Sequence, residues 1–186
     1  MRIFHLLIIN LSFILSACAL PAPNLVTSNN IVARHGMWDI ICFEKEKYCA
    51  AGARYYDTRS PRQGQPEKIL LQPLVFKVGN DSKPQIAFLM FLPAEVRKVH
   101  GVRISIENGF QDELHLVQCT EDRCLATILF EGSRLKQLLR SKSLIAIYQL
   151  SPLQREPIIV DTPLGDLRAA IEDADKRTIR RYGRRP

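Results

Sequence analysis

The first seventeen residues of the chain have the layout of a secretory signal. One basic residue, Arg2, precedes a mostly apolar run from Ile3 to Leu15, and this order is typical of segments that direct export. The run is too short to cross a bilayer as a helix, which takes about 20 residues. Export constrains the fold, because cysteines of an exported protein can pair as disulfides. We therefore expect a chain that works outside the cytosol, with residues 1–17 as its signal peptide.

The signal ends in Leu15-Ser16-Ala17-Cys18, which resembles a bacterial lipobox. Cleavage after Ala17 would leave Cys18 as an acylated N-terminus, and several acyl chains hold a protein at a membrane where one gives only marginal binding. Ala19 follows the cysteine, which resembles default sorting to the outer membrane, facing the periplasm or the cell surface. The alternative is ordinary signal cleavage, because Ala17, Cys18 and Ala19 also satisfy a small-x-small rule and would leave a soluble periplasmic protein.

The five cysteines agree with export. With Cys18 as the lipid carrier, four remain, and four cysteines allow three connectivities. The spacing favours two local pairs at hairpin ends, Cys42 with Cys49 and Cys119 with Cys124. Each small loop would stabilise the fold by roughly 2 kcal/mol. The alternative is a zinc site, but structural zinc ligands usually stand about two to four residues apart. We predict disulfides, no metal and no other cofactor.

The net charge of +7 comes from the two ends of the chain. Arg2 and the basic residues of 176–186 account for all of it, and no acidic residue lies in that last stretch. The body of the chain is therefore formally neutral, which argues against nucleic acid as a partner. Arginines of the tail recur at three- and four-residue steps, so a helical continuation would gather them into one basic stripe. The stripe would hold Arg177, Arg180, Arg181, Arg184 and Arg185.

Such a stripe would meet particular partners in an envelope compartment. The anionic ones are lipid headgroups, lipopolysaccharide phosphates, cell-wall polymers and acidic proteins. Each basic residue near an anionic surface adds about 1 kcal/mol of binding, screened by salt. A solvated tail without a partner is the alternative, because charge runs are often of that kind.

Between the signal and the tail, short apolar segments alternate with turns. Residues 18–35 contain Pro, Ser and Asn and predict a lipidated N-terminus with a flexible tether, and residues 36–175 predict one β-sandwich domain of two antiparallel sheets. Pro73 cannot donate to a ladder, so its strand should be an edge or be broken by a bulge. Helices are expected at 133–140 and 164–179. The expected strands are 38–42, 48–56, 68–78, 85–92, 102–107, 113–118, 125–130, 144–150 and 157–161.

Several short motifs occur in a fixed order along this domain. They are Trp38-Asp39-Ile40-Ile41-Cys42 with Cys49, Phe91-Leu92-Pro93, Gly101 to Ile106 before Gly109, the Cys119 and Cys124 pair with Ala126, and a leucine-rich short helix. Together, over about residues 36–173, they resemble the invasion-associated locus B (IalB) family. The resemblance implies an immunoglobulin-like sandwich in an exported envelope protein, with a role in host-cell invasion or envelope integrity.

Three positions depart from the family's pattern. The family tends to carry a glutamine shortly after its second cysteine, where this chain has residues 50–53, Ala-Ala-Gly-Ala. It often has a glycine directly before its fourth cysteine, where this chain has Arg123. A glycine followed by an aromatic residue is usual near the C-terminus, but here Asp166 follows Gly165.

The sequence contains no familiar catalytic motif. Ser133 follows Gly132 but lacks the second glycine of a nucleophile elbow, and His115 alternates with apolar neighbours, so it should face solvent or a rim. Trp38 should fill the core, although an exposed anchor for a partner is the alternative. We therefore predict a non-enzymatic binding module. The alternatives are a periplasmic hydrolase whose residues converge only in three dimensions and an assembly factor for the outer membrane.

Overall fold

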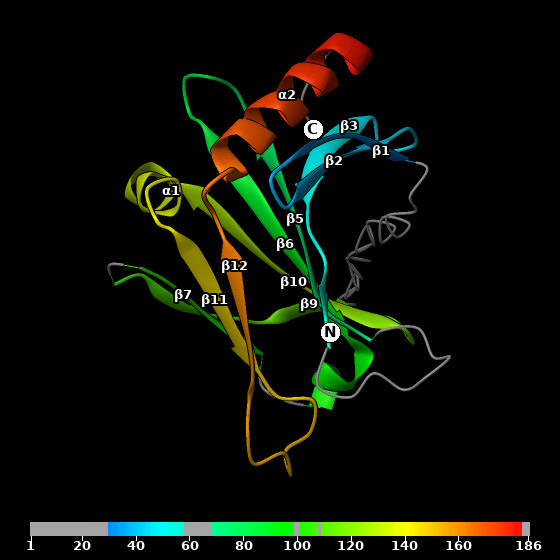
Figure 1. Cartoon of the computed structure of the whole chain (residues 1–186), viewed down its shortest axis with the longest axis vertical. Helices are drawn as coiled ribbons and strands as arrows, with labels where there is room; N and C mark the ends of the chain where they lie inside the picture. The colour runs from blue at the N-terminus through cyan, green and yellow to red at the C-terminus, as the bar shows by residue number, and fades with distance from the viewer. Residues whose placement is uncertain (1–29, 58–67, 99–100, 108, 184–186) are drawn as a thin grey trace, which may run out of the picture.

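Two antiparallel sheets form the body of the computed structural model, which describes residues 30–57, 68–98, 101–107 and 109–183 (Figure 1). The larger sheet has the order β1-β2-β3-β5-β6-β10-β9, with β4 beside β5, and the smaller has the order β12-β11-β7-β8. The predicted antiparallel β-sandwich with a short helix and a C-terminal helix is confirmed. The signal, Cys18 and most of the predicted tether lie outside the described residues.

The bounds of the elements are as follows. The larger sheet contains β1 (Ile31–His35), β2 (Trp38–Phe43), β3 (Tyr48–Gly52), β4 (Tyr55–Tyr56), β5 (Ile69–Val78), β6 (Gln85–Pro93), β9 (Leu116–Cys119) and β10 (Arg123–Glu131). The smaller sheet contains β7 (Val102–Ile106), β8 (Gln111–Leu114), β11 (Ser143–Tyr148) and β12 (Ile158–Pro163). The helices are the 3-10 helix η2 (Ala94–Lys98), α1 (Gly132–Leu138) and α2 (Leu167–Tyr182).

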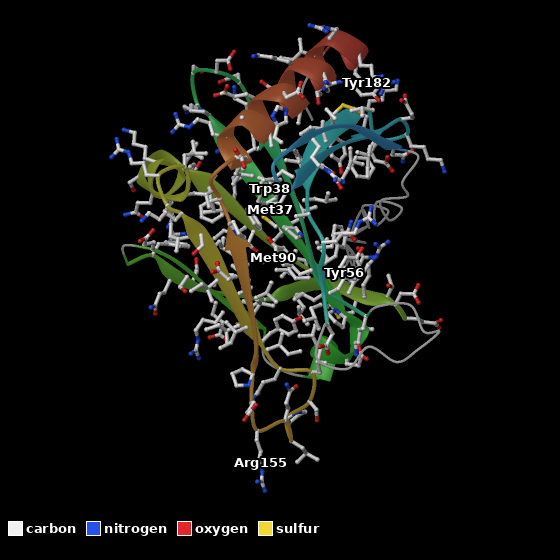
Figure 2. The ribbon with its side chains drawn as sticks, viewed as in Figure 1. Met37, Trp38, Tyr56, Met90, Arg155 and Tyr182 are labelled. Atoms are coloured by element: carbon white, nitrogen blue, oxygen red, sulfur yellow. A yellow bond between two sulfur atoms is a disulfide. The ribbon has the colours of Figure 1, made fainter. Side chains whose placement is uncertain are left out.

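The core lies between the two sheets, where alternate side chains of each strand meet. Trp38 is completely buried, and its Nε1 donates to the carbonyl oxygen of Pro163 at 3.2 Å, so this side chain joins β2 to the end of β12 (Figure 2). Phe130 packs edge-on against Phe88 and Phe110, with ring centroids 6.1 and 5.8 Å away. The prediction that Trp38 fills the core is confirmed.

Pro73 does not place β5 at an edge, contrary to the first of the two predicted possibilities. β5 lies between β6 on one side and β3 and β4 on the other. The Ala53 N–H donates to the Pro73 carbonyl oxygen at 3.2 Å, so the backbone of Pro73 faces the point where the expected strand 48–56 breaks into β3 and β4. The N–H that proline lacks falls at this break, which is why an interior strand tolerates it.

The expected strand 113–118 is two strands of different sheets. β8 ends at Leu114 in the smaller sheet, and β9 begins at Leu116 in the larger one. His115 lies at the crossing and is exposed, as predicted. Gly101 permits the crossing, because it has φ +130° and a Cβ there would come within 2.5 Å of the Leu114 carbonyl oxygen.

Both ends of the domain are more ordered than the sequence predicted. Residues 31–35, expected to be tether, form β1 and pair with β2. The C-terminal helix runs three residues past the expected end at 179, so most of the expected tail 176–186 belongs to α2. Gly183 ends the helix in a left-handed conformation, and its N–H donates to the Ile179 carbonyl oxygen at 2.8 Å.

Candidate functional site

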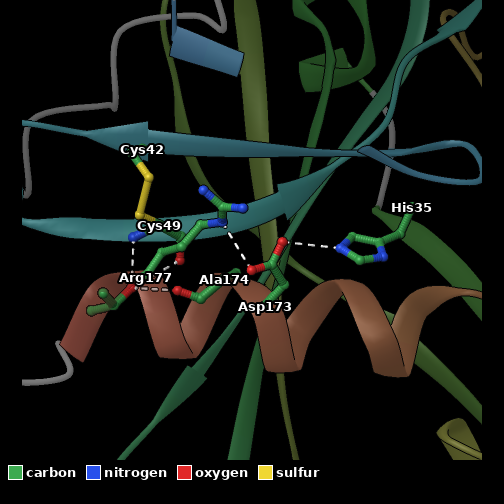
Figure 3. Close-up of polar contacts among 7 residues, drawn as sticks. His35, Cys42, Cys49, Asp173, Ala174 and Arg177 are labelled. Carbon is green, nitrogen blue, oxygen red and sulfur yellow. Dashed lines mark hydrogen bonds and ion pairs between the residues drawn. A yellow bond between two sulfur atoms is a disulfide. The ribbon is translucent and has the colours of Figure 1, made fainter. Parts of the chain in front are cut away.

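The C-terminal helix is fixed against the larger sheet by one buried threonine. Thr178, which is 2% exposed, accepts a 2.8 Å hydrogen bond from the Cys49 N–H through Oγ1 and donates to the Ala174 carbonyl oxygen at 2.9 Å (Figure 3). Cys49 also forms the disulfide with Cys42. The helix therefore packs directly over the disulfide-linked β2–β3 hairpin.

A polar cluster joins the same helix to β1. His35 Nε2 lies 3.0 Å from Asp173 Oδ2, and Arg177 Nε donates to Asp173 Oδ1 at 2.9 Å. Burial alone would raise the pKa of Asp173, but the hydrogen bonds from His35 and Arg177 outweigh it and hold this pKa below its usual value. The negative form of Asp173 is thus favoured, and it links β1 to α2 (Figure 3).

The predicted arginine stripe is divided by these contacts. Arg177 is engaged by Asp173, and Arg181 Nη1 lies 3.3 Å from Glu44 Oε1 in the β2–β3 turn. Arg180 is exposed, as is Lys176 one turn earlier, and Arg184 and Arg185 lie outside the described residues. Sequence spacing gave the helical positions and is compatible with the Asp173–Arg177 pair, four residues apart on α2. It could not show that Arg181 faces Glu44 in the β2–β3 turn.

An exposed surface nevertheless remains at the last turns of α2. Lys176, Arg180 and Arg181 are exposed there, and the side chain of Ile179 between them is 43% exposed. We call these residues the basic end of α2. The acidic residues of the helix all lie before residue 176, so the basic end combines cations with one apolar side chain, a pattern typical of surfaces that meet anionic interfaces.

Both predicted disulfides are present. Cys42 pairs with Cys49 and Cys119 with Cys124, with S–S distances of 2.05 and 2.00 Å. Each connects neighbouring strands of one hairpin, as the local connectivity predicted. The lipidation site Cys18 lies outside the described residues, so the lipid anchor stays a prediction.

The candidate catalytic side chains, histidines and Ser133, do not converge in the described part of the chain. His35 contacts Asp173, whereas His115 is exposed at the sheet crossing, and Ser133 is exposed on α1. His5 and His100 lie outside the described residues. Among the residues that the structure describes, no three His, Cys, Asp or Glu side chains are close enough together to hold a metal ion.

A second surface feature, which the sequence did not predict, lies between β4 and β12. It is an open cavity of about 290 Å³. Tyr55 lines one side of it. Burial raises the pKa of Tyr55 to about 12, so its phenol group stays protonated at neutral pH. The alternating pattern of β12 shows which residues face outward, but no local signal shows that β4 comes to lie beside it. The cavity is lined by Tyr55, Tyr56, Asp57, Leu70, Ile158, Ile159, Val160 and Asp161.

Comparison with known proteins identifies the family. The sequence model described as Invasion associated locus B (IalB) protein matches residues 38–175. The chain belongs to the IalB family. The crystal structure of invasion associated protein B from Bartonella henselae is similar in fold, with a TM-score of 0.60 and 16% sequence identity over 76% of this chain and 94% of that one. None of the curated protein sequences matches the chain.

The IalB match covers both disulfides and the first nine of the sixteen residues of α2, and it ends at residue 175. The basic end of α2 therefore lies just past the matched range. As for membrane-spanning elements, the described helices include none with the length and apolar character that a bilayer crossing requires.

Proposed function

We propose that this IalB-family protein is an exported lipoprotein of the bacterial cell envelope and acts as a non-enzymatic binding module. The lipobox-like sequence at Cys18 supports acylation, and the two disulfides support an oxidising compartment. The outer membrane is the proposed location, with a soluble periplasmic form as the alternative. The family's name supports a role in host invasion, and the envelope location supports one in envelope integrity.

The observation that carries this proposal is the basic end of α2. Thr178 holds the helix firmly on the sheet, so Lys176 and Arg180 are presented in a fixed position rather than on a loose tail. An anionic envelope surface would attract these cations, and Ile179 would add apolar contact with it. The lipid at Cys18 would supply the anchor, and the basic end would add a second, salt-sensitive attachment.

Charge reversal at the basic end is expected to weaken vesicle binding. Lys176→Glu with Arg180→Glu should lower partitioning onto vesicles containing phosphatidylglycerol by about tenfold or more at low salt, because each lost cation removes about 1 kcal/mol. Co-sedimentation of the non-acylated domain measures it. Deleting the whole tail would be a poorer test, since it also removes Thr178.

A matched control comes from α1 and the residues just after it. Lys136 and Arg140 are also exposed and four residues apart, so Lys136→Glu with Arg140→Glu changes the net charge equally at a different place. This control should bind vesicles almost as the wild type does. Equal losses in the two double variants would show that only net charge matters, and the proposed attachment site would be wrong.

The anchor itself is tested by Cys18→Ser in the full chain. Wild-type protein should fractionate with membranes and be released by detergent, and its mature N-terminal peptide should carry the mass of acyl chains. The variant should lose the acyl mass and most of its membrane association, because several acyl chains are needed for stable anchoring. A wild-type N-terminus without lipid would favour the soluble periplasmic form.

A further inference from the structure

β12 forms an open edge of the smaller sheet. Among the described residues, β11 is the only strand that pairs with it. The Leu164 N–H donates to the Lys142 carbonyl oxygen at 2.8 Å. This bond determines which residue pairs of the antiparallel ladder are hydrogen-bonded. In such a ladder alternate residues exchange hydrogen bonds with the neighbouring strand. Ile158, Val160 and Thr162 therefore bond to β11, and the backbone groups of Ile159 and Asp161 point away from the sheet.

The open part of this edge is short and well defined. Pro163 also faces outward, but it has no N–H, and its carbonyl oxygen accepts the hydrogen bond from Trp38. That leaves the N–H and C=O groups of Ile159 and Asp161, spaced two residues apart as the backbone groups of an added extended strand require. The Ile159 side chain beside them is 63% exposed. An edge of this kind is a template for a further strand.

The cavity beside the edge indicates the chemistry of that strand. It lies along β12, and its other wall is β4, with Tyr55 and Tyr56. Among the residues that the structure describes, its lining includes Asp161 and no lysine or arginine. Tyrosine rings and a carboxylate together suit a lysine or arginine side chain, through ion pairing and cation–π contact.

We propose that an extended peptide segment of a partner protein adds to β12 as a further strand and places a basic side chain in this cavity beside Asp161. The backbone would provide affinity and the cavity selectivity, as in other cases of strand addition. A second copy of this chain fits less well, because pairing β12 with itself would bring two Asp161 carboxylates to the same short edge. The proposal rests on the binding role proposed above and uses a surface separate from the basic end of α2.

The test uses short fluorescent peptides in which valine alternates with either lysine or glutamate. Fluorescence anisotropy should show the lysine peptide binding the disulfide-linked domain, with the glutamate peptide at least tenfold weaker. Ile159→Pro removes an outward N–H but no hydrogen bond to β11, a change that an edge strand tolerates, and should weaken the lysine peptide about tenfold. Ile159→Thr keeps that N–H and should stay within about threefold. Asp161→Asn should weaken binding and reduce its dependence on salt.

Several outcomes would overturn the proposal. Equal binding of the lysine and glutamate peptides, or equal losses for Ile159→Pro and Ile159→Thr in folded protein, would exclude strand addition of a basic segment. Sedimentation that shows wild-type dimers lost in Ile159→Pro would make a second copy the occupant. The variant Lys176→Glu with Arg180→Glu should bind the lysine peptide as the wild type does, so failure of the vesicle test leaves this one intact.

Discussion

Replacing Trp38 with alanine is expected to lower the free energy of unfolding by about 3–5 kcal/mol, the usual cost of removing a large buried aromatic side chain. Trp38 is fully buried between the sheets, and its Nε1 bonds to Pro163 at the end of β12. The change would therefore open a cavity and separate two elements that lie far apart in sequence. Because domains are stable by only about 5–15 kcal/mol, urea denaturation should show a large shift of the midpoint.

Two further variants test this role, one by separating packing from hydrogen bonding and the other as a surface control. Trp38→Phe keeps most of the apolar volume and loses the N–H, so it should cost clearly less than Trp38→Ala. Leu153→Ala removes a side chain that is 91% exposed and should change stability by less than about 0.5 kcal/mol. If Trp38→Ala cost as little as Leu153→Ala, Trp38 would not hold the two sheets together.

The parts of the fold that the sequence predicted depend on neighbours along the chain. Trp38, Ile40 and Cys42 alternate with other residues, which is enough to place them on one face of a strand. The two cysteine pairs are separated by seven and five residues, so each lies within one hairpin and needs no knowledge of the rest of the fold. Local periodicity and local spacing therefore account for the strands, the disulfides and the sandwich class.

What the sequence could not predict depends on contacts between distant residues. His35 and Asp173 are 138 residues apart, and Cys49 and Thr178 are 129 apart, so neither contact leaves a local signal. The interior position of Pro73 depends on a break between two neighbouring strands. The same holds for the basic stripe, because helical spacing gives the faces of α2 and only docking decides which face the sheet covers.

Removing the Cys42–Cys49 disulfide is expected to destabilise the domain more than removing the Cys119–Cys124 disulfide. The two loops are nearly equal in length, so loop closure predicts about 2 kcal/mol for each and a difference of only a few tenths. Their surroundings differ, however. Cys42 and Cys49 are 3% and 1% exposed and lie under α2, whereas in the second pair Cys124 is fully buried but Cys119 is exposed at the edge strand β9.

The double variant Cys42→Ala with Cys49→Ala should therefore lose both the stabilisation from loop closure and the packing beneath the helix. Together these should lower the free energy of unfolding by about 3–4 kcal/mol. The variant should also loosen α2, which hydrogen exchange at Thr178 and its neighbours would detect, because the Cys49 N–H would no longer be held in place for Thr178. Cys119→Ala with Cys124→Ala should lose a similar contribution from loop closure and the packing of Cys124 alone, about 2–3 kcal/mol in all, and leave exchange in α2 unchanged. Equal losses in both variants, with α2 equally protected, would mean that loop closure alone sets the effect and that the helix docks independently of the disulfide below it.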